Sequence, residues 1–199
     1  MNDHSQNHAR TPQCHVVCQK EHIGIINKTI FPGTHGGPHL HAIAAVGQSL
    51  LEINGVDQYP DGRDFITYSQ AVIDTTKALE QGLAAAGLDI VSPSQNHLCL
   101  AKLPNQLDSL AFQKALESVG IITNRNMLPF DTKSAWKPSG MRFGTAALTS
   151  RGLTVGQAGE IGQLIGDLAQ GRASDSTVSA QVKHIVEHLN WYYHDLPAH

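Results

Sequence analysis

The sequence predicts an α/β fold in which helices alternate with short strands, most clearly in the second half of the chain. Apolar residues recur three and four positions apart in several long segments, which is typical of helices with one buried face. Short apolar runs bounded by turn residues lie between these segments, as expected for strands. Gly87, Gly120 and Gly171 follow predicted helices, at the position where helices often end.

The first part of the chain is predicted to contain two helices joined by a glycine-rich loop. Its polar, aperiodic start, residues 1–12, is predicted to be disordered. The predicted elements that follow are a strand at His15–Cys18, a helix at Glu21–Lys28, the loop Phe31–His41 and a helix over residues 38–53. The second helix is predicted from a stripe of apolar residues at helical spacing, namely Ile43, Val46, Leu50 and Ile53. The turn residues Asn54-Gly55 predict a boundary between one domain over 13–54 and a second over 55–199.

The second domain is predicted to be a sandwich of helices and short strands. Its predicted helices are Asp64–Ala86, a helix capped by Asp108, a helix opened by Thr154 and Gln157, and Asp175–Tyr193. Its predicted strands are Leu88–Val91, His97–Leu103, Ile121–Thr123 and Met141–Gly144. The regularly spaced glycines Gly156, Gly159, Gly162 and Gly166 have no preceding strand and no G-x-G spacing, so they indicate close helix packing rather than a dinucleotide site.

Composition narrows the functional classes. The net charge of −3 gives no indication of a nucleic-acid surface, and no apolar run approaches the length of a membrane span. The polar start does not resemble a signal peptide. An odd number of cysteines, three, is typical of reduced thiols and predicts a cytoplasmic protein.

Several histidines have the spacing of metal ligands. The three groups are Cys14, Cys18 and His22; His35, His39 and His41; and His184 and His188, which belong to an H-x-x-E-H pattern. Each group lacks a ligand that would complete a metal site, and the pattern ends only eleven residues before the end of the sequence. No metal is therefore predicted, and His184 and His188 are predicted to be solvated.

Two features predict binding of anions. The loop contains Gly33, Gly36 and Gly37, which can adopt positive φ and bring backbone N–H groups close to a ligand beside a helix start. A tight turn without a ligand is the alternative. Arg142 lies on a predicted strand flanked by glycines, where a guanidinium offers a planar fork for a carboxylate. A surface salt bridge is the alternative for Arg142.

Five segments resemble one family in residues, order and spacing. They are Ile26–Ala45, Tyr68–Val72, Asn96–Leu98, Asn124–Pro129 and Ser139–Gly152. These segments are similar to serine hydroxymethyltransferase, and the resemblance runs from about residue 10 to 195. Ser139-Gly-Met-Arg-Phe-Gly-Thr-Ala-Ala-Leu-Thr-Ser-Arg-Gly152 is the most specific of them.

The resemblance implies the carboxy-terminal part of a fold-type I enzyme that uses pyridoxal 5′-phosphate (PLP), with the end of its large domain and the whole small domain. The family moves a one-carbon unit between serine and tetrahydrofolate. The resemblance implies that Gly36 and Gly37 contact the PLP phosphate of a partner subunit across a dimer interface. It assigns the substrate carboxylate to Arg142. The residues that it places along the folate site are Asn126, Ser134, Ala135 and Trp136.

The sequence also departs from the family. Relatives carry an amino-terminal half with the lysine that holds PLP covalently, and this sequence shows no such half. Asn7 lies near the position of that lysine, and an amide cannot form the covalent link. The prediction is a serine hydroxymethyltransferase-like protein, inactive by itself and forming a homo-oligomer. The alternatives are a non-catalytic partner of a full-length homologue and a truncated remnant.

Overall fold

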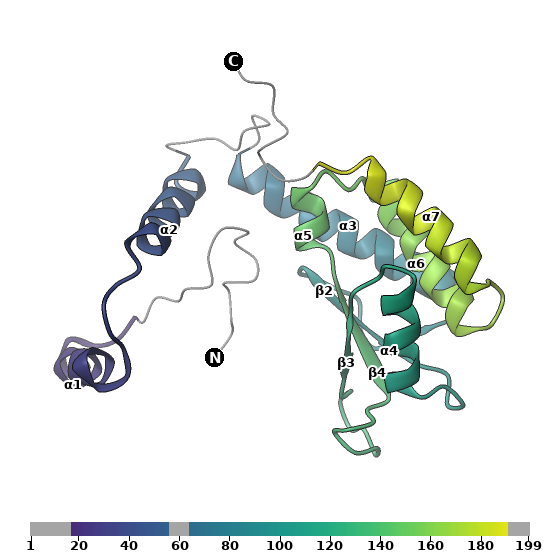
Figure 1. The fold of residues 1–199 in the computed structure, drawn as a ribbon, viewed down its shortest axis with the longest axis horizontal. Coiled ribbons are helices and arrows are strands. Elements are labelled where there is room, and N and C mark those ends of the chain that lie inside the picture. Colours follow the sequence, from purple (N-terminus) through teal and green to yellow (C-terminus); the bar gives the residue numbers. More distant parts are fainter. Residues whose placement is uncertain (1–16, 56–63, 191–199) are drawn as a thin grey trace. The chain divides into compact units, whose positions relative to one another are not determined.

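A computed structural model describes residues 17–55 and 64–190 of the chain. The chain divides into two compact units, one up to Phe65 and one from Ile66 (Figure 1). This division follows the predicted boundary at residue 55 by ten positions, next to residues 56–63, which lie outside the described ranges. The boundary at residue 55 therefore stays a prediction, as does the disorder of residues 1–12.

The first unit consists of helices and a loop, as predicted. Its elements are a 3₁₀ turn at Lys20–His22, α1 at Ile23–Lys28, a wide helical turn at Thr29–Thr34 and α2 at Leu40–Ile53. Val17 and Cys18 are not in a strand, which corrects the described part of the predicted strand. Helix α2 begins at Leu40 rather than Pro38, because His39 occupies the capping position.

The second unit is a mixed α/β structure, which confirms the predicted class. Its helices are α3 at Phe65–Ala85, α4 at Ser109–Ser118, α5 at Ala146–Ser150, α6 at Val155–Ala169 and α7 at Asp175–Glu187. Its strands are β1 at Asp89–Ile90, β2 at Leu98–Lys102, β3 at Asn124–Asn126 and β4 at Gly140–Gly144. All strand pairs are antiparallel, in the order β1-β2-β4-β3. Figure 1 shows α6 and α7 lying side by side.

The core of this unit lies between the sheet and the helices. Alternate residues of the strands, Cys99, Ala101, Met141 and Phe143, are buried in one cluster with residues of α3, α4, α6 and the segment after α7. On α3 one face is buried, with Leu79 and Leu83 at its centre. Since side chains alternate across a strand, the residues between these point to the other face of the sheet.

Helices α3 and α6 cross with their backbones close together. A Cβ atom on Gly162 would lie 2.9 Å from Leu83 N and 3.1 Å from the Cα of Gly82. A Cβ on Gly82 would in turn lie 2.8 Å from Gln163 N. Only glycine fits at such separations, which confirms the predicted packing role for Gly162. At Gly156 a Cβ would meet no atom within 4 Å, so that glycine has no such role.

Several elements of this unit differ from the prediction. Residues 121–123 are not a strand, because Ile121 N donates to Leu116 O at the end of α4 and is not available to the sheet. The strand instead begins at Asn124. Helix α5 was not expected from the sequence. Helix α7 ends at Glu187, and Asn190 beyond it exchanges hydrogen bonds with Arg151, whose O accepts from Asn190 N and whose Nε donates to Asn190 O, both at 3.0 Å.

Candidate functional site

Arg142 lies at the centre of the sheet, on the face opposite the helices. It occupies the middle of β4, where its Cα pairs with Leu100 of β2 on one side and Asn124 of β3 on the other. Its neighbours along the strand, Met141 and Phe143, are buried among the helices. The side chain of Arg142 is half-buried and therefore accessible from solvent. Backbone pairing on both sides holds the Cα of this arginine firmly.

The guanidinium of Arg142 is oriented by Asn124. Its Nε donates to the Asn124 Oδ1 at 3.3 Å, across the β3–β4 pair. Within the ranges that the structure describes, its two Nη nitrogens have no hydrogen-bond partner. Two parallel N–H donors at the end of a guanidinium match the two oxygens of a carboxylate. The arrangement can bind a carboxylate end-on.

The loop between β3 and β4, residues 127–139, is organised around Asp131. Its carboxylate accepts from Ser139 N at 2.7 Å, Ser139 Oγ at 2.8 Å and Lys133 N at 3.0 Å. These hydrogen bonds, led by the Ser139 N–H, hold the pKa of Asp131 well below its usual range. Asp131 therefore stays ionised and closes the base of the loop.

The residues predicted to line a folate site lie at the end of β3 and in this loop. Asn126 pairs with Gly140, and its Nδ2 donates to Met127 O at 2.6 Å. Arg125 Nη1 donates to Trp136 O at 2.9 Å, which keeps the Ser134–Trp136 segment beside β3. Ser134 and Ala135 are exposed, and Trp136 is 83% exposed. The structure thus gathers Asn126, Ser134, Ala135 and Trp136 in the hairpin that also carries Arg142.

Gly36 and Gly37 belong to the first unit. Both are exposed, and a Cβ on either would meet no atom within 4 Å. Within the described part of this unit, the backbone is therefore accessible to a phosphate. Neither Gly33, Gly36 nor Gly37 has positive φ, which corrects the conformational reason given for these glycines from sequence.

The remaining predicted sites divide into those that the structure describes and those that it does not. Asn7 and Cys14 lie outside the described residues. His184 and His188 are exposed, as predicted, and His188 Nδ1 lies 2.7 Å from His184 O. The rings of His39 and His41 meet edge to face, 5.6 Å apart. Among the described residues no group of three or more His, Cys, Asp or Glu could hold a metal, and no helix there could cross a membrane.

The family is decided by the stretch that contains this site. Residues 14–165 match the family model of serine hydroxymethyltransferase, which is more than half of the 199 residues. The chain belongs to the serine hydroxymethyltransferase family. The Arg142 strand, the Asp131 loop and the Gly36-Gly37 loop all fall within the matched stretch. Members of the family are PLP-dependent transferases of fold type I.

Curated relatives agree with this assignment. A serine hydroxymethyltransferase from Sorangium cellulosum is 30% identical over 86% of this chain and 40% of its own length. One from Rhodopirellula baltica is 36% identical over 75% of this chain and 34% of its own length. One from Haloquadratum walsbyi is 35% identical over 83% of this chain and 39% of its own length. The chain thus spans well under half the length of the relatives that it matches.

Sequence reasoning missed two residues of the site. Asn124 was not identified as a partner of Arg142, because the strand was placed at residues 121–123 and the register was therefore unknown. Asp131 was not identified as the anchor of the loop. The sequence does carry a signal for Asp131, because an Asp that follows Pro129 and Phe130 is typical of a turn closed by a side chain.

Proposed function

We propose that this chain supplies the carboxy-terminal part of a PLP-dependent serine hydroxymethyltransferase, including the group that binds the amino-acid carboxylate. The observation that carries the proposal is the Arg142 guanidinium, tethered through Nε and, among residues 17–55 and 64–190, without a partner at either Nη atom. It lies on the most specific of the segments that resemble the family. Serine or glycine is the substrate, and tetrahydrofolate or an aldehyde is the second reactant.

The chain's own residues would orient the reactants. Arg142 would hold the carboxylate of the amino acid, with Asn124 fixing the direction of the fork. The hairpin with Asn126 and Ser134–Trp136 would line the folate site, where the exposed Trp136 ring offers an apolar face. Gly36 and Gly37 would contact the phosphate of PLP held by a partner subunit. PLP would supply the electron sink for breaking the bond to the hydroxymethyl carbon.

By itself, the 199-residue chain is expected to be inactive. The relatives are more than twice as long as the part that this chain matches, and Asn7, near the position of their PLP lysine, carries an amide that cannot form the covalent link. We also propose a cytoplasmic location, which the unpaired thiols of Cys18 and Cys99 support. An absorption band that forms with the purified chain, PLP and glycine together, and not when any one of the three is left out, would contradict the expected inactivity.

Fragment complementation tests the proposal. The chain is co-expressed with the remaining part of the Sorangium cellulosum relative, and serine–glycine exchange is measured. We expect activity to return, and Arg142→Lys to raise KM for serine by about 100-fold because a bidentate charge-assisted contact is lost. Arg172→Lys, the same change at an exposed position after α6, is the control and keeps KM unchanged. An unchanged KM for Arg142→Lys would contradict the proposed role of Arg142.

A second candidate function is a non-catalytic partner of a full-length homologue. The exposed apolar residues of α2 favour it, since Leu40 is 70% and Ile43 is 51% exposed. Co-purification with the Rhodopirellula baltica relative tests this function. We expect Gly36→Asp to abolish association and Gly24→Asp, equally free of neighbours on α1, to preserve it. Absence of any association would exclude the partner role.

A further inference from the structure

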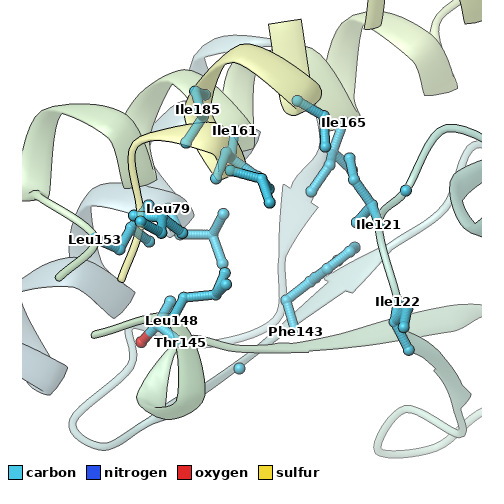
Figure 2. Close-up of a pocket in the computed structure, with 15 residues that line it drawn as sticks. Leu79, Ile121, Ile122, Phe143, Thr145, Leu148, Leu153, Ile161, Ile165 and Ile185 are labelled. Carbon is cyan, nitrogen blue, oxygen red and sulfur yellow. The ribbon is translucent and has the colours of Figure 1, made fainter. Parts of the chain in front are cut away.

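The second unit contains a cavity that the proposed function does not use. Its volume is about 100 Å³, and it lies between the sheet and the helices α5, α6 and α7. Figure 2 shows labelled side chains surrounding a central space, with Ile161 of α6 and Phe143 of β4 on opposite sides. Since Phe143 and Arg142 are consecutive on one strand, the cavity and the Arg142 side chain lie on opposite faces of the sheet.

The lining of this cavity is apolar. It comprises leucine, isoleucine, valine, phenylalanine and glycine residues together with Thr145. The Thr145 hydroxyl is already engaged, at 2.6 Å from Thr76 Oγ1 and 3.3 Å from Val72 O. A buried water needs two to four polar partners, and the side chains of this lining, with the Thr145 hydroxyl engaged, do not supply them. The space therefore favours an apolar occupant over water.

The cavity is maintained by the backbone around it. Gly120, in its wall, has φ of +91°, a conformation that side-chain-bearing residues rarely adopt. A larger residue at Gly120 that could fill the space is therefore strained. Ile122 also lines the cavity and is 92% exposed, so it marks a route from solvent.

We propose that this cavity is a binding site for a compact, uncharged and apolar molecule, such as a small aromatic or aliphatic hydrocarbon. Size sets the upper limit: the cavity, at about 100 Å³, is smaller than a cavity of about 150 Å³ that binds benzene or xenon, so a ligand no larger than benzene is expected. The Thr145 hydroxyl already has hydrogen-bond partners, which favours an apolar ligand. A ligand hydroxyl or amine would lose its hydrogen bonds to water without replacement.

Benzene and xenon are the probes that test the proposal, with the full 199-residue chain labelled at isoleucine methyl groups for NMR. We expect both probes to shift the methyl signals of Ile161, Ile165 and Ile185, which line the cavity. With benzene at ten times its Kd, we expect Tm to rise by about 4 °C. Phenol should bind at least about tenfold more weakly than benzene, because its hydroxyl would have no partner.

Variants that fill the space provide the control. Ile161→Phe is expected to abolish the benzene and xenon shifts, while Val155→Phe on the same helix, at a half-exposed position outside the lining, leaves them unchanged. Leu148→Phe fills the cavity from α5 and serves if Ile161→Phe fails to fold. Absence of shifts at saturating benzene and high xenon pressure would overturn the proposal, as would equal shifts in Ile161→Phe and Val155→Phe. Phenol affinity equal to that of benzene would overturn the apolar class.

Discussion

Helix α2 in the first unit and helix α3 in the second carry apolar residues at the same spacing but differ in burial. On α2, Ile43 is 51% and Leu50 is 46% exposed, whereas on α3 Leu79 is 5% and Leu83 is 0% exposed. Helix α3 has a partner within its unit, α6, whose glycines let the two backbones approach. The comparison shows that apolar periodicity predicts a helix with one apolar face. It does not predict which other element, if any, covers that face.

The largest expected difference comes from truncating one leucine in each stripe. Leu83→Ala should lower the free energy of unfolding by about 3 kcal/mol, because it leaves a cavity among fully buried neighbours. Leu50→Ala should change it by less than about 0.5 kcal/mol, because that side chain is already half in water. Urea unfolding of the two variants measures the difference. Equal losses would show that α2 is buried in solution, by another copy or another protein.

Two glycines on α6, Gly162 and Gly156, allow a test of the close packing between α6 and α3. Gly162→Ala should destabilise the second unit by about 2 kcal/mol, because its Cβ would press on the Leu83 backbone. Gly156→Ala should stabilise it by about 0.5 kcal/mol, since that Cβ meets no atom within 4 Å and alanine favours the helix. Thermal unfolding followed by circular dichroism distinguishes the two. A stabilising Gly162→Ala would contradict the close crossing of α3 and α6.

The two described cysteines also differ in burial, and the buried one is expected to make the stability of the second unit depend on pH. Burial, with a further contribution from the Glu80 charge, raises the pKa of the Cys99 thiol from 9.0 to about 12, whereas Cys18 is exposed. In the unfolded chain the Cys99 thiol ionises with a pKa near 9.0. The contribution of the buried, neutral thiol to the free energy of unfolding is therefore complete below pH 9.0 and is lost as the pH rises toward 12. Urea unfolding from pH 8 to 11 measures this loss.

The control for this dependence is Cys99→Ala, which should remove that component of the slope. At pH 8, iodoacetamide should modify Cys18 and leave Cys99 intact in the folded chain. Rapid modification of Cys99 would mean that the core of the second unit opens readily.

The smallest effect is expected in the Asp131 loop, at the surface of the second unit. Asp131→Asn should loosen the loop at pH 7, because the hydrogen bonds from Ser139 and Lys133 favour the ionised carboxylate. Since folding lowers this pKa from 3.8, the stabilisation is present above pH 3.8, and the difference between variant and wild type should shrink as the pH falls below that value. Amide exchange at Ser139 reports the change, with Asp89→Asn as a control. A difference that persisted at low pH would contradict the role of the charge.

The sequence predicted helices better than strands or contacts. Capping residues and terminal glycines located α3, α4 and the start of α6 closely, since those signals are local. The strand at residues 121–123 was misplaced because Ile121 serves the end of α4 through Leu116, a choice that depends on the fold. Arg142 was found from its own segment, whereas Asn124 required the register of β3 against β4. Burial of α2 could not be predicted either, because its stripe has the same spacing as a buried one.

The tether between Asn124 and Arg142 has a consequence for the entropy of binding. A free arginine side chain loses up to about 2 kcal/mol of rotamer freedom when it is immobilised on a ligand. In this chain β4 is bonded on both sides, and the Nε is already held before any ligand arrives. Part of that ordering therefore takes place when the sheet folds, which leaves a carboxylate only the two terminal nitrogens to fix.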